Sequence, residues 1–148
     1  MKRIVTFVIC LIALVASVPP SQAISSSQII MHEEANLENG IICIDEIIVD
    51  HTARSTDKQG RRVKTFLYDD TVIAQIEITV VFRYDGSTVS VISKSVTQKS
   101  TYDGWSYNQT SFTSSGGTAT LKFKLSKWLI LNNSYTMSLT CDKNGNLS

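Results

Sequence analysis

Few side chains in this sequence could carry out catalysis. Histidine is the usual general base at neutral pH, and the chain contains two, His32 and His51. His51 lies eight residues after Cys43, an arrangement that could supply a cysteine nucleophile with its base. We expect Cys43 to face the core and His51 to begin a polar loop, so the two would not meet. Motifs for a serine nucleophile, a catalytic zinc or a phosphate-binding loop do not occur in the sequence, so we predict that the protein is not an enzyme and uses no cofactor.

A group of aromatic residues is the best candidate for ligand binding. Tyr102, Trp105 and Tyr107 occur within six residues, with Asp103 and Asn108 between or beside them. Aromatic rings with polar neighbours can stack on the face of a sugar and hydrogen-bond its hydroxyl groups. Trp105 and Tyr107 share one face of a strand, however, and packing in the core explains that pattern equally well. The predicted binding residues are Trp105, Tyr107, Tyr102 and Asn108.

Residues 142–146, Asp-Lys-Asn-Gly-Asn, place oxygen side chains at alternate positions, as a calcium loop does. The glycine is the fourth residue of the segment instead of the sixth, and no glutamate follows to bind calcium through both oxygens. An Asn-Gly turn explains the segment better. Neither Cys43 nor Cys141 has a second cysteine or histidine at the spacing of zinc ligands. We therefore predict no metal site.

Cys43 and Cys141 are in phase with apolar neighbours in strand-like runs, so both side chains should point inward. They lie 98 residues apart, and a disulfide between them would contribute about 4 to 5 kcal/mol in the chain-entropy account. Cysteine is also among the most frequently buried residue types. The sequence therefore allows either a disulfide between Cys43 and Cys141 or two separately buried thiols.

The composition describes one ordinary domain: 148 residues, 43% hydrophobic and 18% charged, with a net charge of +1. Such a balance gives no electrostatic basis for nucleic-acid binding. Charges are unevenly placed, however, because residues 33–50 hold six acids and no base, whereas residues 54–64 are strongly basic. The basic residues are Arg54, Lys58, Arg61, Arg62 and Lys64. They either lie in a solvated loop, pair with the acidic segment, or attract anionic wall polymers or lipid headgroups.

The beginning of the sequence has the three regions of a secretory signal peptide. Lys2 and Arg3 precede an apolar stretch at residues 4–18, and cleavage is predicted after Ala23. About 15 apolar residues are fewer than the ~20 that a membrane-spanning helix needs. Cys10 lacks the preceding small residue that lipid attachment requires. We predict that residues 1–23 are a signal peptide and that the remaining chain is secreted, without a stable membrane anchor.

Short segments of alternating polarity follow, which is the pattern of half-buried strands. The clearest covers residues 74–84 and leads into an Asp-Gly pair suited to a tight hairpin turn. Its apolar face carries Ile76, Ile78, Val80, Phe82 and Tyr84. The other strands are expected at residues 41–49, 61–68, 88–96, 105–114, 118–125 and 135–141.

Seven strands with turns between them and no helical crossover predict an all-β fold, an antiparallel β-sandwich of immunoglobulin-like architecture, with a closed barrel as the alternative. This domain should cover residues 41–148. Residues 24–40 are predicted to be a polar lead, with helix formers and a final glycine that allow a short helix at residues 32–40.

Three motifs in the second half of the chain carry a resemblance to a known group: the hairpin at residues 84–87 (YDGS), the tryptophan segment at 104–107 (GWSY) and the final residues 138–148 (SLTCDKNGNLS). From about Val72 to Ser148 the sequence resembles small secreted proteins of Gram-positive gut bacteria, grouped as a domain of unknown function. The resemblance implies a bacterial exported β-domain. It supplies no catalytic or binding residues that could be transferred.

The predicted function is that of a secreted, non-enzymatic module that binds through its surface or associates with the cell envelope. Candidate partners are a glycan or an anionic cell-wall polymer. The alternative is a secreted effector, or bacteriocin-like protein, that acts on neighbouring cells.

Overall fold

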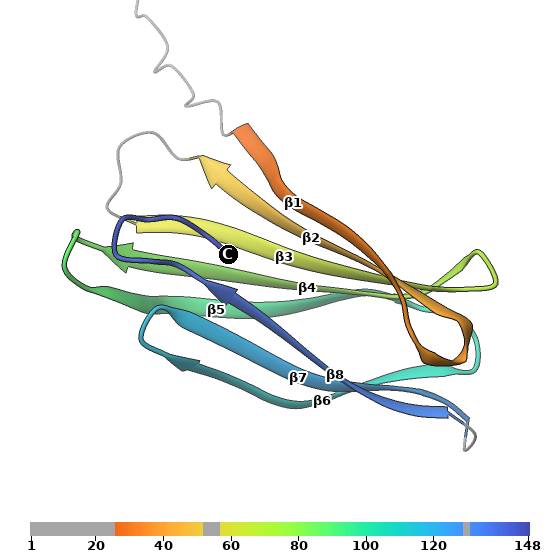
Figure 1. Ribbon diagram of the computed structural model, residues 1–148. Helices are drawn as coiled ribbons and strands as arrows, with labels where there is room; N and C mark the ends of the chain where they lie inside the picture. The colour runs from red at the N-terminus through yellow and green to blue at the C-terminus, as the bar shows by residue number, and fades with distance from the viewer. Residues whose placement is uncertain (1–25, 52–56, 129–130) are drawn as a thin grey trace, which may run out of the picture.

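The computed structural model describes residues 26–51, 57–128 and 131–148, which form eight antiparallel strands and one turn of 3-10 helix (Figure 1). The elements are β1 (Ser26–Asn36), η1 (Glu38–Gly40), β2 (Ile41–His51), β3 (Asp57–Tyr68), β4 (Thr71–Tyr84), β5 (Val89–Thr101), β6 (Trp105–Ser115), β7 (Thr118–Lys127) and β8 (Leu131–Thr140). The predicted all-β sandwich is confirmed, with eight strands instead of seven. The predicted signal peptide lies outside the described residues.

The strands follow one another as a meander in two sheets. Strands β1 to β5 form the larger sheet in sequence order, and β6 to β8 form the smaller one. The two-sheet architecture agrees with the immunoglobulin-like expectation, whereas the strand order is sequential instead of the Greek key of immunoglobulin domains. Because each strand reverses direction, the β1–β2, β3–β4 and β5–β6 connections lie at one end of the molecule, at the right in Figure 1, together with the end of β7 and the start of β8. We call this end the loop end.

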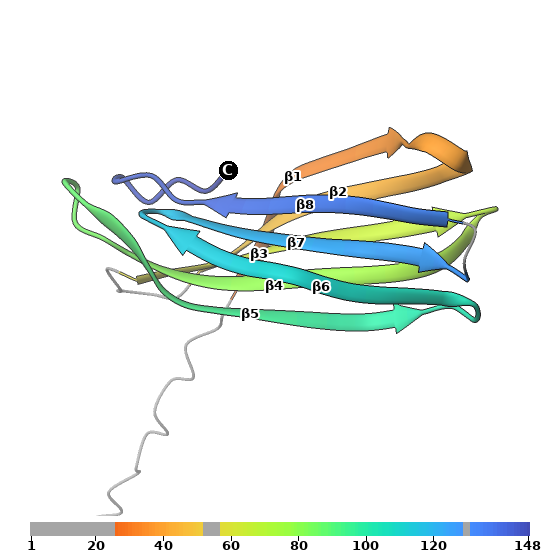
Figure 2. The same ribbon diagram turned by 90° about the horizontal axis from the view of Figure 1, so that it is seen from below.

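The core lies between the two sheets, where Figure 2 shows β6 to β8 lying across the larger sheet. The predicted inner face of β4 is confirmed, since Ile76, Ile78, Val80 and Phe82 are fully buried. They pack with residues from the facing sheet, which include Leu121, Phe123, Leu125, Met137 and Leu139. Alternation at period two thus places one apolar row from each strand into a shared interior.

Most of the predicted polar lead at residues 24–40 is a strand, and the short helix that its sequence allows is confined to one turn at Glu38–Gly40. The chain is a strand as far as Asn36, paired with β2 from Asn36↔Ile42 onward, and only Glu38–Gly40 form a helical turn. Pairing satisfies the main-chain groups along one side of β2, which outweighs the weak helix preference of these residues. Gly40, with φ +72°, then turns the chain back into β2.

Cys43 and Cys141 are both buried, as predicted, but they are free thiols and form no disulfide. Cys43 pairs across the sheet with Phe66, whose ring centre lies 4.7 Å from that of Tyr135. Tyr135 precedes Cys141 by six residues, which in a strand span about 20 Å. A disulfide needs Cα atoms within about 7 Å, so the two cysteines face the same interior at different heights. Burial raises the pKa of both thiols.

The basic segment pairs with the acidic one. Arg62 donates two hydrogen bonds to the carboxylate of Asp45, at 2.9 and 2.7 Å, and Lys64 donates a third. Arg61 contacts Asp50 in the same way, through its Nε at 3.1 Å and its Nη2 at 3.0 Å. Two carboxylates thus engage three of the five positive charges that an anionic polymer would need, and they neutralise two of them. A fourth, Arg54, lies outside the described residues.

The segment at residues 142–146 is a turn held by its own first side chain. Asp142 Oδ1 accepts hydrogen bonds from the N–H groups of Asn144 and Asn146, both at 2.8 Å. The chain then runs back along β8, where the N–H of Ser148 and the N–H of Thr140 each donate to the other residue's carbonyl. This return places Leu147 in the core.

Candidate functional site

A hollow of about 220 Å³ lies at the loop end, between the β3–β4 turn, the β5–β6 turn and the end of β7. We call it the aromatic hollow. Its walls carry three rings, those of Tyr68, Tyr102 and Trp105, together with the carboxylates of Asp69 and Asp103. The rings offer flat apolar surface and the carboxylates accept hydrogen bonds. Stacking and hydroxyl recognition are therefore possible in one place.

Tight turns with unusual backbone angles bring these residues together. Asp69 and Asp70 have φ of +51° and +55°, the geometry of a two-residue hairpin turn, and aspartate tolerates it better than most residues. Gly104, with φ +80°, reverses the chain between β5 and β6. The N–H of Trp105 then donates to the carbonyl of Tyr102 at 2.9 Å. Each turn thus sets two site residues at the rim of the sandwich.

A fourth ring, that of Trp128, lies next to the residues that line the aromatic hollow. Trp128 follows β7 and is 70% exposed, which is unusual for tryptophan. The main-chain N–H of Trp128 donates a hydrogen bond to the carbonyl of Gly104 at 3.2 Å, and the indole ring of Trp128 lies against that glycine. Lys127 holds its ammonium nitrogen 4.7 Å from the ring centre of Tyr68, 5.7 Å from that of Trp105 and 5.8 Å from that of Trp128. These cation–π contacts help to fix the rings around the hollow.

The structure divides the four predicted binding residues. Tyr102, 57% exposed, and Trp105, 6% exposed, both line the aromatic hollow. The ring of Tyr107 instead packs on that of Phe123, with the ring centres 5.5 Å apart, and burial raises the pKa of the Tyr107 hydroxyl. Among described side chains with buried polar atoms, its hydroxyl is the one that lacks a hydrogen-bond partner. Asn108 is exposed, and strand alternation turns it to the opposite face of the sheet from Trp105.

Sequence reasoning missed Tyr68, Asp69, Lys127 and Trp128. They stand at 68–69 and 127–128, far along the chain from residues 102–105. The meander brings them together because alternate connections share one end of the sandwich. A usable signal was present, since the first pair straddles the end of the predicted strand at residues 61–68 and the second follows the predicted strand at residues 118–125 by two residues. The apolar run beginning at Trp128 has no period, which obscured it.

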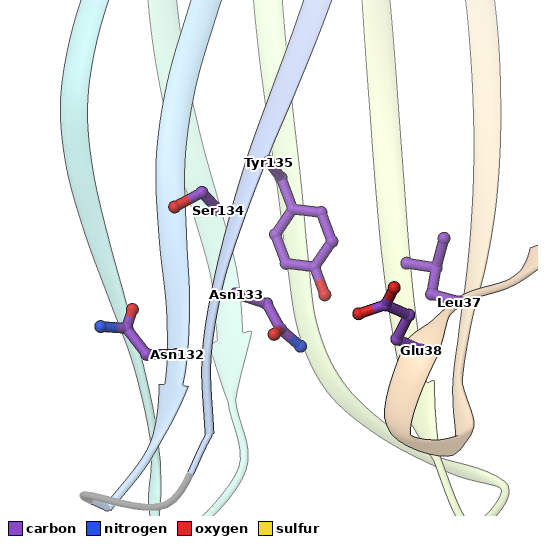
Figure 3. A pocket seen from close by; sticks show the side chains of 6 residues that line it. All are labelled: Leu37, Glu38, Asn132, Asn133, Ser134 and Tyr135. Atoms are coloured by element: carbon purple, nitrogen blue, oxygen red, sulfur yellow. The ribbon is translucent and has the colours of Figure 1, made fainter.

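A second hollow, of about 290 Å³, lies between η1 and the start of β8 (Figure 3). Figure 3 shows the polar ends of Glu38, Asn133 and Tyr135 pointing toward one another, whereas Asn132 and Ser134 point away. Burial raises the pKa of Tyr135, and a hydrogen bond with Asn133 opposes that shift. We call this the Glu38 hollow.

A shallower depression of about 450 Å³ lies between the two hollows. It is lined by Asn39, Gly40, Tyr68 and Asp69. Tyr68 and Asp69 also line the aromatic hollow, and Asn39 is next to Glu38 in sequence. The depression and the aromatic hollow therefore adjoin through Tyr68 and Asp69, and together they form a polar and aromatic band at the loop end.

Both histidines lie away from this band. His32 on β1 contacts Glu46 Oε1 through its Nδ1 at 2.9 Å, in an exposed pair. The side chain of His51 lies outside what the structure describes. Within the described ranges, no three His, Cys, Asp or Glu side chains come together as a metal site, and no helix is long and apolar enough to span a membrane.

Comparisons with protein-family models, with curated protein sequences and with solved structures find no match for this chain. The function must therefore be argued from the loop end itself.

Proposed function

We propose that the protein is a secreted, non-enzymatic β-sandwich module that binds glycans at its loop end. The observation that carries the proposal is the aromatic hollow, where the exposed ring of Tyr102 lies among the residues that include the carboxylates of Asp69 and Asp103. The exposed ring of Trp128 lies next to the hollow, against Gly104 and Lys127. Sugar rings have an apolar face and a rim of hydroxyl groups, so they require stacking surface and hydrogen-bond acceptors together. Export by the predicted leader would bring the module to extracellular glycans.

The charges favour an uncharged glycan over an anionic wall polymer. The aromatic hollow holds two carboxylates and one ammonium group, that of Lys127, and the ammonium already faces three rings. Arg61, Arg62 and Lys64 are paired with carboxylates elsewhere. An anionic polymer would therefore meet repulsion at the hollow and few unpaired charges beside it.

Tryptophan fluorescence titrations would test the proposal. The ligands are neutral oligosaccharides of glucose, mannose and N-acetylglucosamine, with teichoic acid as the anionic comparison. We expect at least one neutral oligosaccharide to shift the emission of Trp128. Trp128→Ala and Tyr102→Ala should each weaken binding about fivefold to tenfold, the loss of one stacking contact, when measured by calorimetry.

Tyr102→Phe is the matched control because it keeps the ring and should keep most of the affinity. Ile92→Ala controls for removal of an exposed apolar side chain far from the hollow. Absence of binding to every oligosaccharide would overturn the proposal. So would binding that survives unchanged in the Trp128→Ala, Tyr102→Ala double variant.

A further inference from the structure

The rings at the aromatic hollow already hold a positively charged group of the protein itself. Lys127 is directly opposite Trp105 in the β6–β7 register, so its side chain lies beside that ring. Its ammonium nitrogen lies 4.7 Å from the ring centre of Tyr68, 5.7 Å from that of Trp105 and 5.8 Å from that of Trp128. Several rings around one ammonium group are the arrangement by which proteins recognise cationic ligands.

The carboxylates of the hollow carry more charge than Lys127 offsets. Asp69 and Asp103 line the hollow together with Lys127, so two negative charges face one positive charge. The ion pairs among the described residues include none of these three side chains. The ammonium of Lys127 is therefore held at the rings, and both carboxylates are available to a ligand.

We propose that the glycan bound at the aromatic hollow is an amino sugar with free, protonated amino groups. This inference rests on the proposed glycan function and names the class of sugar. The ligand's ammonium group is attracted by the ring faces and by the carboxylates of Asp69 and Asp103, while its sugar ring stacks on Tyr102. A neutral sugar makes the stacking contact without the charge contacts.

Lys127 gives way to the ligand in this account. Its ammonium contacts at the hollow are cation–π contacts, which are weak at exposed positions, and its four-carbon stem is flexible. An incoming ammonium group makes the same contacts with the rings and adds attraction to two carboxylates. Lys127 thus acts as a competitor for cationic ligands and has no such effect on neutral ones.

Three β-1,4-linked trisaccharides would test the proposal by calorimetric titration: those of glucosamine, N-acetylglucosamine and glucose. They share one backbone and differ in an ammonium, acetamide or hydroxyl group at one position of each ring. We expect the glucosamine trisaccharide to bind about fivefold to tenfold more tightly than either neutral one. This preference should shrink as salt is added, because salt screens exposed charges.

Variants of the two carboxylates test whether the preference arises in the hollow. The Asp69→Asn, Asp103→Asn double variant should bind all three trisaccharides about equally, and asparagine also tolerates the φ of +51° at position 69. Glu46→Gln is the matched control, since it removes a negative charge in the middle of β2, where Glu46 contacts His32. That variant should keep the preference.

Lys127→Met tests the competition. It should increase the ratio of glucosamine to N-acetylglucosamine affinity about twofold to threefold, because the competing ammonium is gone. Loosened rings alone would weaken both ligands alike and leave the ratio unchanged, which would contradict the role given to Lys127.

The outcomes separate this inference from the proposed function. Neutral trisaccharides that bind as tightly as the glucosamine one would overturn the inference and leave glycan binding standing. A preference that survives in the double variant would also overturn it. Absence of binding by all three, and by the other neutral oligosaccharides, would overturn both proposals.

Discussion

The guanidinium of Arg62 donates a hydrogen bond to the main-chain oxygen of Ser138, which joins the inner face of the larger sheet to the edge of the smaller one. The same group holds Asp45 through two parallel hydrogen bonds, the geometry that makes arginine–carboxylate pairs strong. A charged cluster therefore links two apolar layers. It also occupies a main-chain acceptor on a strand that would otherwise be open to pairing.

Arg62→Met should lower the free energy of unfolding by about 2 to 3 kcal/mol, because Asp45 would lose its main partner while it stays buried. Urea unfolding followed by circular dichroism measures the loss. Arg83→Met is the control, since Arg83 and Asp57 form a more exposed pair, and we expect little change there. Equal stability of Arg62→Met and the parent would show that the link between the sheets contributes nothing.

Stability should fall in acid. Burial alone would raise the pKa of Asp45, but hydrogen bonds from Arg62 and Lys64 together lower it below its ordinary value. Between the lowered pKa and the ordinary value of about 3.9, the unfolded chain binds a proton more readily than the folded one. The contribution of ionised Asp45 to the free energy of unfolding is thus complete above about pH 5, and it is lost as the pH falls through the pKa of Asp45 in the folded protein. Urea unfolding from neutral to acid pH should show this decline, and a shallower one for Asp45→Asn.

Gly104→Ala should weaken glycan binding through Trp128. A Cβ at Gly104 would lie 3.0 Å from Nε1 of Trp128, so the indole must shift by a few tenths of an ångström. Gly86→Ala is a close control, because Gly86 has nearly the same φ, +83°, but no atom within 4 Å of the new Cβ. Both variants should lose about 1 kcal/mol of stability from the positive φ, and only Gly104→Ala should lose affinity. Calorimetric titration beside urea unfolding separates the two effects.

Leu147→Ala should destabilise the fold by about 2 to 3 kcal/mol, the usual cost of a shortened core side chain. Leu147 packs against Gly60 and Leu139 where the chain returns along β8. Val72→Ala, at an exposed position, should cost much less. Thermal melts of the two variants provide the comparison, and equal melting temperatures would contradict the packing described for Leu147.

Cys43 and Cys141 should resist alkylation by iodoacetamide in the folded protein, because burial shields both thiols and raises their pKa values. Unfolding in urea without a reductant should expose both. Peptide mass mapping before and after unfolding distinguishes the cases. A Cys43–Cys141 cross-linked peptide from the unreduced protein would contradict the structure.

The sequence was informative where one face of a strand is buried. Ile76, Ile78 and Val80 alternate with polar residues, so their strand, its faces and the following turn could be predicted. β1 could not, because both of its faces are largely exposed and no apolar alternation marks it. The inward orientations of Cys43 and Cys141 were predictable for the same reason. Alternation gives no information, however, on how far apart the two residues lie along the strand direction.

The candidate site was predictable only in part. Tyr102 and Trp105 could be predicted because they are aromatic and lie close together in the sequence. Their neighbours Tyr68 and Trp128 are placed by strand order and by two tight turns, which no local pattern reveals. Tyr107 shows the opposite error. Its ring lies next to the candidate residues in sequence, but in the structure it packs against the core.

An even number of antiparallel strands has a consequence for how the molecule can be held. β1 begins and β8 ends at the same pole (Figure 1), and the residues that line the aromatic hollow are at the other. A tether at either extremity would therefore stand about 35 Å, one strand length, from a captured sugar.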